Sequence, residues 1–476
     1  MNVKRGQRNE LTCCFRKKKT SIFVGFDGCP VQTLILYCFS LSMTFTLFWI
    51  MWFPKTENPA IWILIRANLL DSLVFRCGSI SCLRSKSLQG SVIGLMITAS
   101  HNPEEDNGVK LIDPNGEMLD PEWEPFAQSF GNADPADLKS LLDPFLSSRQ
   151  IELSDPAVVV IGRDTRPSSQ RLAAAAAAGV RCFNGEVIEM GLLTTPQLHF
   201  IVKCQNDPSY GDASEDGYYD KLLNAFRELN RHLPEGGQHY DRFVCIDCAN
   251  GVGALKMAKV QERISDLLTI RLQNTGVTGK LNEKCGADFV KLNQQAPDGM
   301  NLEPQTRYAS FDGDADRIVY FYASSPSSGT TSSFHLLDGD KIATLIALYL
   351  DKLLTGSGLR SQLTLSLIQS AYANGSSTIY AKEVLKIETD CVPTGVKFLH
   401  SRAKDFDVAV YFEANGHGTV LFSQKATNLI QESCNSGNES ARNLLHLIDL
   451  INQVSMVCEM SAGCCRVSAL ERSPTG

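Results

Sequence analysis

Apolar residues recur with two spacings along this chain, and the two alternate from about residue 70 onward. Residues 70–86, LDSLVFRCGSISCLRSK, have the apolar spacing of a helix, whereas residues 91–100, SVIGLMITAS, read as a buried strand. Residues 156–183 predict a strand, a polar turn and an alanine-rich helix capped near Ser168 or Ser169. Further strands and helices are expected in residues 242–257, 310–322 and 336–354. Strands that alternate with helices favour parallel sheets, so the pattern predicts an α/β fold.

The first 69 residues do not follow this pattern. Residues 31–53 contain no charged side chain and are long enough to span a bilayer, and four basic residues at positions 16–19 precede them. Two interpretations are open: a membrane anchor, and a leader that is foreign to the rest of the chain.

Composition narrows the classes of partner. Hydrophobic residues make up 43% of the chain and charged residues 20%, which is typical of a globular protein with a core. A net charge of −7 gives no cationic surplus, so we expect no nucleic-acid partner. The sequence contains sixteen cysteines, and its one C-x-x-C pair, Cys245 and Cys248, lies in an apolar run without the second pair that a zinc site needs. We expect buried, reduced thiols.

The clearest chemical pattern is FDGDADR. Asp312, Asp314 and Asp316 alternate with glycine and alanine and precede an apolar strand. Side chains two positions apart in extended backbone point the same way, so we expect the three carboxylates to converge on one hard cation, Mg²⁺. An acidic surface turn is the alternative. A second Asp-Gly-Asp, at positions 338–340, lacks the third aspartate and the arginine, and we interpret it as a turn and a helix cap.

A serine and a histidine stand side by side in TASHNPEEDNGVKL, where an apolar run ends. A serine near a magnesium-binding triad can carry a phosphoryl group, because the metal and nearby cations offset the developing charge on oxygen. On this interpretation Ser100 is the carrier, and His101 and Lys110 are proton carriers or phosphate contacts. Taken alone, Ser-His-Asn-Pro is also typical of turns.

A third polar pattern follows an apolar strand in YFEANGHG. Glu413, Asn415 and His417 alternate there, which predicts a carboxylate, an amide and an imidazole on a common side. Such a trio can hydrogen-bond the vicinal hydroxyls or the acetamido group of a sugar. A polar loop that uses Gly416 and Gly418 for its turn is the alternative.

Together these segments resemble the α-D-phosphohexomutases, in the branch that acts on N-acetylglucosamine phosphates. The resemblance covers about residues 70–454 and lies in TASHNPEEDNGVKL, GRDTRPSS, GLLTTPQLH, DCANGVGALK, CGADFVK, SFDGDADRIVY, DGDKIATLI, AYANGSST and FEANGHGT. FEANGHGT matches this branch rather than the enzymes for glucose or mannose phosphates. The resemblance implies interconversion of N-acetylglucosamine 6-phosphate and 1-phosphate through a 1,6-bisphosphate, toward UDP-N-acetylglucosamine, with Mg²⁺ and a hexose 1,6-bisphosphate as phosphoryl primer.

The resemblance also implies residue roles and a domain order. Ser100 would be the phosphoserine and a metal ligand through its phosphate, and Arg317 would steady the phosphoryl group. The implied metal ligands are Asp312, Asp314 and Asp316, and the implied sugar contacts are Glu413, Asn415 and His417. We expect three consecutive α/β domains with mixed, largely parallel sheets. Their bounds are 70–189 for the phosphoserine domain, 190–322 for the metal-binding domain and 323–455 for the sugar-binding domain, between a leader at 1–69 and a tail at 456–476.

Two family features have no counterpart in this sequence. One is a Gly-Thr-Ala-Gly-Phe-Arg-like segment, in whose place residues 61–70 read IWILIRANLL, and the other is a fourth domain with an Arg-Pro-Ser-Gly-Thr phosphate loop. We therefore expect a mutase with impaired turnover. The alternative is a weakly active or inactive isoform that binds sugar phosphates, either free or tethered to a membrane. Because the leader matches nothing in the family, we expect the chain to be cytoplasmic rather than anchored by residues 31–53. We also expect a monomer.

Overall fold

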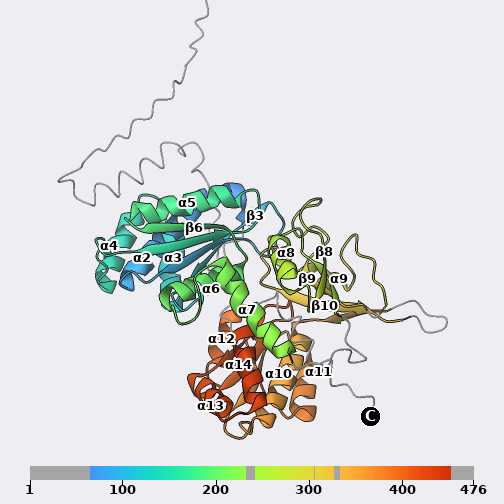
Figure 1. Ribbon diagram of the computed structural model, residues 1–476. Coiled ribbons are helices and arrows are strands. Elements are labelled where there is room, and N and C mark those ends of the chain that lie inside the picture. The colour runs from blue at the N-terminus through green and yellow to red at the C-terminus, as the bar shows by residue number, and fades with distance from the viewer. Residues whose placement is uncertain (1–64, 232–241, 305, 326–332, 452–476) are drawn as a thin grey trace, which may run out of the picture. The chain divides into compact units, whose positions relative to one another are not determined.

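A computed structural model gives the fold of residues 65–231, 242–304, 306–325 and 333–451 (Figure 1). The described strands form one five-stranded and two four-stranded sheets, and β1 (Ile65–Arg66) pairs with β3 (Asp106–Asn107). Helices pack against each of the larger sheets. The prediction of three α/β domains with mixed sheets is confirmed.

The first sheet contains the buried strand that precedes Ser100. Its order is β4 (Val109–Ile112), β2 (Ile93–Ile97), β5 (Val158–Arg163) and β6 (Glu186–Leu192), with β4 antiparallel and the others parallel. All five residues of β2 are buried, as the unbroken apolar run predicts. The helices of this region are α2 (Asp71–Ser87), α3 (Glu124–Asn132), α4 (Leu138–Arg149) and α5 (Ser169–Cys182), and the short η1 (Ala67–Leu69) and η2 (Pro121–Trp123) are 3₁₀ turns.

The alanine-rich helix α5 lies unusually close to α2. A Cβ atom at Gly78 would collide with the carbonyl oxygen of Ala176, and one at Gly179 would collide with that of Phe75. Small side chains are therefore needed for packing as well as for helix propensity. The helix begins where we predicted, with Ser168 at the N-cap position. The Ser168 side chain, however, makes no capping hydrogen bond and instead accepts one from Asn107 Nδ2 at 2.9 Å.

The second sheet carries the aspartate turn. Its order is β11 (Phe334–Leu337), β10 (Ile318–Ala323), β9 (Tyr308–Phe311), β7 (Phe243–Asp247) and β8 (Thr269–Gln273), and its helices are α8 (Gly253–Ile264) and α9 (Ala287–Asn293). Strands β9 and β10 form an antiparallel hairpin in which Phe311 pairs with Ile318. Cys245 and Cys248 are buried and form no disulfide, in agreement with the sequence prediction.

The third sheet carries the Glu-Ala-Asn-Gly-His turn. Its order is β13 (Glu388–Val392), β12 (Leu365–Ser370), β14 (Val408–Phe412) and β15 (Gly418–Phe422). Its helices are α10 (Gly339–Gly356), α11 (Gly375–Ile379), η3 (Tyr380–Val384), α12 (Val396–Ala403), α13 (Gln424–Asn435) and α14 (Glu439–Ile451). Asp338 caps α10 by accepting a hydrogen bond from the Lys341 amide, so the interpretation of the second Asp-Gly-Asp as a turn and helix cap is confirmed.

Two connecting helices join the three sheets into one core. Helix α6 (Thr195–Asn206) packs on the first sheet, and α7 (Glu215–Asn230) packs against both α8 and α14. One hydrophobic cluster accordingly includes Phe200, Phe226 and Leu447. Lys256 on α8 and Lys221 on α7 form ion pairs across these contacts, with Glu215 and Asp449 respectively. This shared core fixes the sheets around the point where their turns meet.

Two of the expected domain divisions fall inside strands. The division at 189/190 lies in β6 and that at 322/323 lies in β10, whereas the first sheet ends at Leu192 and the second at Leu337. The expected tail and residues 31–53 of the leader lie outside the described residues. In the part of the chain that the structure does describe, no helix combines the length and apolar character that crossing a bilayer requires.

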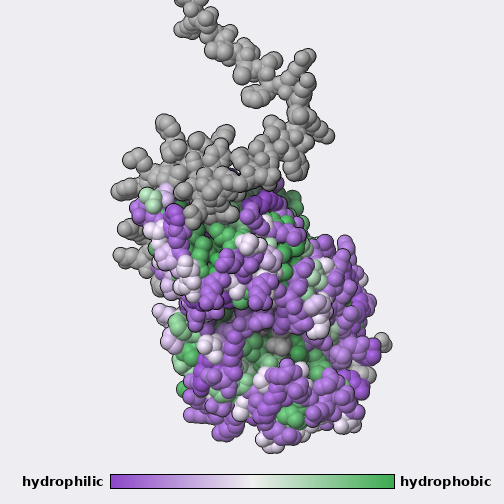
Figure 2. Space-filling view, turned by 90° about the vertical axis from the view of Figure 1, so that its left-hand side faces the viewer, coloured by the Kyte–Doolittle hydropathy of each residue, from purple (hydrophilic) through white to green (hydrophobic). Residues whose placement is uncertain are grey.

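The surface is largely hydrophilic on the face seen in Figure 2. Apolar residues gather there in an upper patch and inside a hollow in the lower half. This distribution agrees with a core in which most of the large apolar side chains are buried.

Candidate active site

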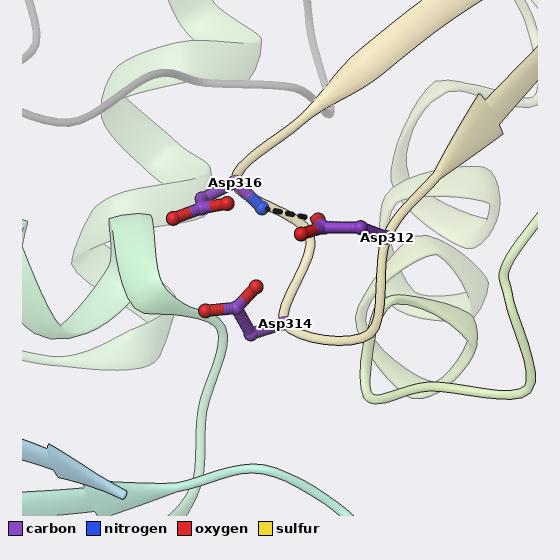
Figure 3. A group of neighbouring side chains, drawn as sticks. All are labelled: Asp312, Asp314 and Asp316. Carbon is purple, nitrogen blue, oxygen red and sulfur yellow. Dashed lines mark hydrogen bonds between the residues drawn. The ribbon is translucent and has the colours of Figure 1, made fainter. Parts of the chain in front are cut away.

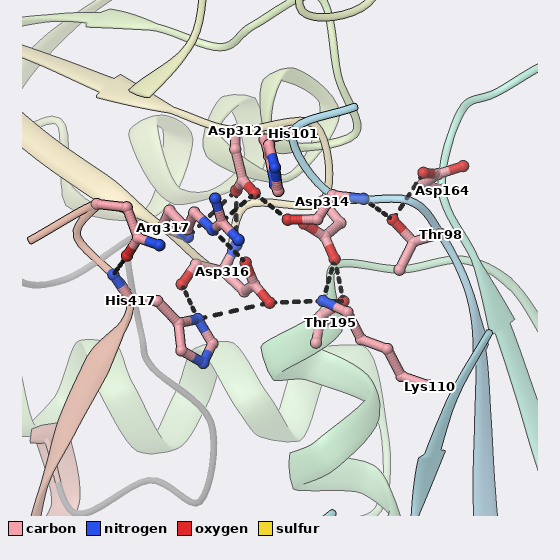
Figure 4. A network of polar contacts seen from close by, with 12 residues as sticks. Thr98, His101, Lys110, Asp164, Thr195, Asp312, Asp314, Asp316, Arg317 and His417 are labelled. Atoms are coloured by element: carbon pink, nitrogen blue, oxygen red, sulfur yellow. Dashed lines mark hydrogen bonds and ion pairs between the residues drawn. The ribbon is translucent and has the colours of Figure 1, made fainter. Parts of the chain in front are cut away.

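Three turns, one from each sheet, meet at a single buried polar cluster (Figure 4). Ser100 follows β2, residues 312–317 join β9 to β10, and residues 413–417 join β14 to β15. The three motifs that the sequence analysis singled out are therefore brought together, although they are far apart along the chain.

The aspartate triad is a compact set of carboxylates (Figure 3). One oxygen from each of Asp312, Asp314 and Asp316 lies within 4.8 Å of the others, and all three residues are buried. The predicted convergence is confirmed, but the reason given for it is wrong. The residues lie in a tight turn rather than in extended backbone, with Ala315 at φ +57° and with the amides of Asp316 and Arg317 donating to Asp312 Oδ1.

The donor set fits a hard divalent cation. Within the described residues, Asp314 Oδ1 and Asp316 Oδ1 are buried and have no hydrogen-bond partner. Burial, together with the charges of Asp314 and Asp316, raises the pKa of Asp312 well above its usual range. Buried carboxylate oxygens that repel one another and lack donors are what an oxygen-preferring cation such as Mg²⁺ would satisfy.

Ser100 is held against this triad. Its Oγ donates a hydrogen bond to Asp312 Oδ2 at 2.5 Å, and its amide donates to Thr98 Oγ1 at 3.0 Å. The residue is 6% exposed and has a left-handed backbone, with φ +51°. The hydroxyl oxygen therefore lies where a phosphoryl group on it would face the metal ligands and the cations described next.

Two cations flank the carboxylates: Lys110, which is buried, and Arg317, which is partly buried. Lys110 Nζ lies 2.7 Å from Asp314 Oδ2 and 2.6 Å from Asp316 Oδ2. Burial alone would lower the pKa of Lys110, but the two carboxylates outweigh it and raise the pKa, so the side chain is a cation at neutral pH. Arg317 Nη1 donates to Asp288 Oδ2 at 2.6 Å, and its Nε lies 3.7 Å from Asp312 Oδ2.

His101 lies at the more open edge of the cluster. Its side chain is 36% exposed, and its Nδ1 lies 3.9 Å from Asp288 Oδ2. Burial and the neighbouring Arg317 lower the pKa of His101, against the opposing charge of Asp288. The ring is thus near Ser100 and Arg317 but is not hydrogen-bonded into the triad.

The turn 413–417 forms its own hydrogen-bonded unit. Asn415 Nδ2 donates to Glu413 Oε2 at 3.3 Å, and the His417 amide donates to Asn415 Oδ1 at 3.0 Å. His417 Nδ1 lies 2.9 Å from the backbone oxygen of Asp316, which joins this turn to the aspartate turn. The three residues do face one another, but because of a hairpin turn with Gly416 at φ +92° and not because of strand alternation.

The structure adds residues that the sequence patterns did not single out. Thr195, the first residue of α6, donates through Oγ1 to Asp314 Oδ2 at 2.6 Å. Asp288, in the first turn of α9, pairs with Arg317. Thr195 lies in TTPQLH and Asp288 lies in CGADFVK. The sequence analysis noted these segments only because they resemble the family, and neither residue belongs to a pattern of charge or spacing.

A cavity of about 210 Å³ lies beside the cluster. Its lining includes Lys110, Asp316 and His417 from the cluster, together with Glu117 and Tyr411. A cavity lined by a few convergent polar groups is typical of small-molecule sites.

The chain is similar in sequence to proteins of one known enzyme family. Residues 209–319 and 338–458 match the family models described as Phosphoacetylglucosamine mutase AMG1, domain II and domain III, and residues 79–127 and 145–209 match Phosphoglucomutase/phosphomannomutase, alpha/beta/alpha domain I. Human phosphoacetylglucosamine mutase is 48% identical over 395 residues, which cover 82% of this chain and 71% of the human protein. This chain belongs to the phosphoacetylglucosamine mutases.

Other members of the family give the same result. The Candida albicans phosphoacetylglucosamine mutase is 43% identical over 410 residues, which cover 82% of this chain and 74% of that protein. A crystal structure of N-acetylglucosamine-phosphate mutase in its substrate complex, described as a member of the α-D-phosphohexomutase superfamily, matches with a TM-score of 0.81 and 37% identity and covers 93% of this chain and 82% of that one. The Aspergillus fumigatus enzyme in complex with GlcNAc-6P and magnesium matches with a TM-score of 0.80 and 38% identity, over 93% of this chain and 81% of that one. The resemblance read from the sequence is confirmed.

Proposed function

We propose that this chain interconverts N-acetylglucosamine 6-phosphate and N-acetylglucosamine 1-phosphate, with Ser100 as the phosphoryl carrier, as a step toward UDP-N-acetylglucosamine. The observation that carries the proposal is the hydrogen bond of 2.5 Å from Ser100 Oγ to the buried triad, at the meeting point of three turns. Two crystal structures of the Aspergillus fumigatus enzyme support this choice of ligands: one contains GlcNAc-6P and magnesium, and the other contains glucose 1,6-bisphosphate.

The proposed reaction passes one phosphoryl group in each direction. In the first transfer the free hydroxyl oxygen of the sugar monophosphate bonds to the phosphorus on Ser100, the phosphorus–Oγ bond breaks, and the hydroxyl proton is released as Oγ takes one up. The product is a sugar 1,6-bisphosphate. In the second transfer Ser100 Oγ takes the other phosphoryl group, which leaves the isomeric monophosphate. A hexose 1,6-bisphosphate would prime an unphosphorylated Ser100 by the second transfer alone.

The residues around Ser100 are proposed to have three roles: metal binding, stabilisation of phosphoryl charge and proton transfer. Asp312, Asp314 and Asp316 would hold Mg²⁺, which when bound offsets negative charge on the phosphoryl oxygens. Lys110 and Arg317 contribute two further cations that are held in place by carboxylates, so that little reorganisation is needed during transfer. His101 is proposed as the proton carrier because its ring lies at the open edge, beside Ser100.

The turn 413–417 is proposed to orient the sugar. The Glu413 carboxylate can accept hydrogen bonds from two sugar hydroxyls, and Asn415 offers both a donor and an acceptor. His417 is fixed by Asp316, so a sugar that it contacts is held at a constant distance from the metal ligands. Correct orientation of this kind is worth large rate factors in a transfer between two bound groups.

The proposal is tested by measuring conversion of N-acetylglucosamine 6-phosphate in a coupled assay with magnesium and glucose 1,6-bisphosphate. The parent chain is compared with Ser100→Ala and with a control, Ser91→Ala, whose hydroxyl donates to the Leu88 carbonyl. We expect the control to match the parent, and Ser100→Ala to fall to background. Equal turnover in Ser100→Ala would show that Ser100 is not the carrier.

We further propose a cytoplasmic monomer that acts on sugar phosphates, without a nucleic-acid or membrane partner. The buried thiols of Cys245 and Cys248 support a reducing compartment. Alkaline carbonate washing of membranes from expressing cells tests the location: the full chain should leave the membrane pellet, and retention there would overturn this part of the proposal.

A further inference from the structure

Two side chains donate hydrogen bonds to the backbone of the Ser100 turn. Arg166 Nη2 donates to the carbonyl oxygens of Ser100 at 3.2 Å and of Asn102 at 2.8 Å. Asn282 Nδ2 donates to the same two carbonyl oxygens, at 2.8 Å and 2.9 Å. Two side chains, one from the segment after β5 and one from the segment after β8, therefore converge on one pair of carbonyl groups.

Arg166 is itself fixed by a buried network. It is 2% exposed and forms an ion pair with Asp164, which is fully buried and also accepts hydrogen bonds from Thr98 Oγ1 at 2.8 Å and Ser169 Oγ at 2.6 Å. Thr98, which lies beside Asp164 in Figure 4, in turn accepts a hydrogen bond through Oγ1 from the Ser100 amide. The network thus holds both the amide and the carbonyl of Ser100 and leaves the guanidinium little freedom.

Asn282 holds the Ser100 turn against the aspartate turn. It lies in the segment between β8 and α9, and its own amide is tied to the Ala249 carbonyl at 2.9 Å. A Cβ atom at Gly313 would lie 2.6 Å from the Ser100 carbonyl oxygen and 3.0 Å from Asn282 Nδ2, so the aspartate turn is in close contact with both. Asn282 can therefore keep the distance between Ser100 and Asp312 constant.

Such a clamp is needed because Ser100 has an unfavourable backbone. Left-handed φ values are costly for a residue with a Cβ atom and persist where the surroundings enforce them. The carrier must also present its oxygen in nearly the same place through two opposite transfers, and small misplacements of a reacting atom lower rates steeply.

We propose that Arg166 and Asn282 are positioning residues that clamp the Ser100 and Asn102 carbonyl groups and so keep Ser100 Oγ aimed at the metal ligands. This inference rests on the proposed function of Ser100 as the phosphoryl carrier. Neither residue touches the reacting atoms, and both act through the backbone of the Ser100 turn.

The test compares Asn282→Gly with a matched control, Asn250→Gly. Both asparagines have left-handed backbones, at φ +60° and φ +53°, and Asn250 Nδ2 likewise donates to a backbone carbonyl, that of Lys280 at 3.1 Å. Glycine accepts this backbone conformation, so each substitution removes only the side chain. We expect Asn282→Gly to slow single-turnover transfer from glucose 1,6-bisphosphate to Ser100 by about 10- to 100-fold, with KM for N-acetylglucosamine 6-phosphate and the magnesium dependence changed by less than about twofold. Asn250→Gly should stay within about threefold of the parent rate.

Two further measurements complete the test. Arg166 pairs with Asp164 through Nη1 and reaches both carbonyl groups through Nη2. Arg166→Lys keeps a cation beside Asp164 but has one terminal nitrogen instead of two, so it should reproduce the rate loss even if Asn282→Gly folds poorly. Hydrogen exchange at the Ser100 and Asn102 amides should be faster in Asn282→Gly than in Asn250→Gly, whether or not the protein turns over. Equal rates and equal exchange in the two asparagine variants would overturn the clamp. A parent chain that takes up no phosphate on Ser100 would refute the proposed function instead, and the exchange comparison would still decide the clamp.

Discussion

Ser100 Oγ lies 2.5 Å from Asp312 Oδ2, although the two residues are separated by 212 positions in the chain. The bond joins the turn after β2 in the first sheet to the turn between β9 and β10 in the second. A phosphoryl carrier and its metal ligands are thereby built as one unit from two sheets that share a core. The predictions below test parts of that unit separately.

Removal of one carboxylate from the triad should weaken magnesium binding. Asp314 is fully buried and receives hydrogen bonds from Thr195 and Lys110, so Asp314→Asn keeps the shape but loses a charge at the cation site. We expect magnesium affinity, measured by calorimetric titration, to fall by roughly tenfold or more. Asp338→Asn, in the second Asp-Gly-Asp, is the control and should bind magnesium like the parent. Equal affinity in Asp314→Asn and the parent would mean that the triad is only an acidic turn.

A side chain at Gly416 should distort the contact between the sugar turn and the aspartate turn. Gly416 has φ +92°, and a Cβ atom there would collide with the Ile318 carbonyl oxygen. Urea unfolding of Gly416→Ala should show a loss of about 2–4 kcal/mol, from backbone strain plus overpacking. Gly358→Ala is the matched control, since Gly358 also has a left-handed backbone, at φ +74°, but has open space around it, and it should lose only about 1–2 kcal/mol. Equal losses in the two variants would show that the contact with Ile318 does not matter.

Stability should fall as the pH drops from about 6.5 to about 4, in part because of His199. Burial lowers the pKa of His199 from 6.5 to about 4, and its Nδ1 bonds to the Gly116 carbonyl oxygen at 2.5 Å. In this pH range the unfolded histidine binds a proton that the folded one does not, so the free energy of unfolding rises with pH by up to about 1.4 kcal/mol per pH unit from this group. Urea unfolding of the parent and of His199→Gln, which cannot titrate, should therefore differ in slope between pH 4 and pH 6.5. The same slope in both proteins would contradict the buried, neutral state of this histidine.

Sequence reasoning found the elements and the main site residues because each has a local signal. The apolar run of β2, the alanine-rich α5 and the spacing of Asp312, Asp314 and Asp316 can all be read without knowing what lies beside them. The triad was nevertheless predicted for the wrong reason, since its carboxylates converge through a turn at Ala315 rather than through extended backbone.

The contacts between sheets could not be read in this way. Thr195 contacts the Asp314 carboxylate and Asp288 contacts the Arg317 guanidinium, because the fold brings these groups together. No spacing in the sequence predicts either contact. Lys110 was left open between a proton carrier and a phosphate contact, and its pairing with Asp314 and Asp316, about two hundred positions away, is what makes it a fixed cation. The contact of the Ser168 hydroxyl with Asn107, which belongs to another segment, likewise has no signal in the sequence.

The central claim is that Ser100 passes its phosphoryl group to a sugar phosphate and takes one back. The most direct test is to load the parent chain from labelled glucose 1,6-bisphosphate with magnesium, remove free ligand, add N-acetylglucosamine 6-phosphate, and follow the label by peptide mapping and sugar-phosphate analysis. We predict that the label is found on the Ser100 peptide before the addition, and in N-acetylglucosamine 1,6-bisphosphate and 1-phosphate after it. A label that sits on another residue, or that stays on Ser100 when the sugar phosphate is added, would contradict the account.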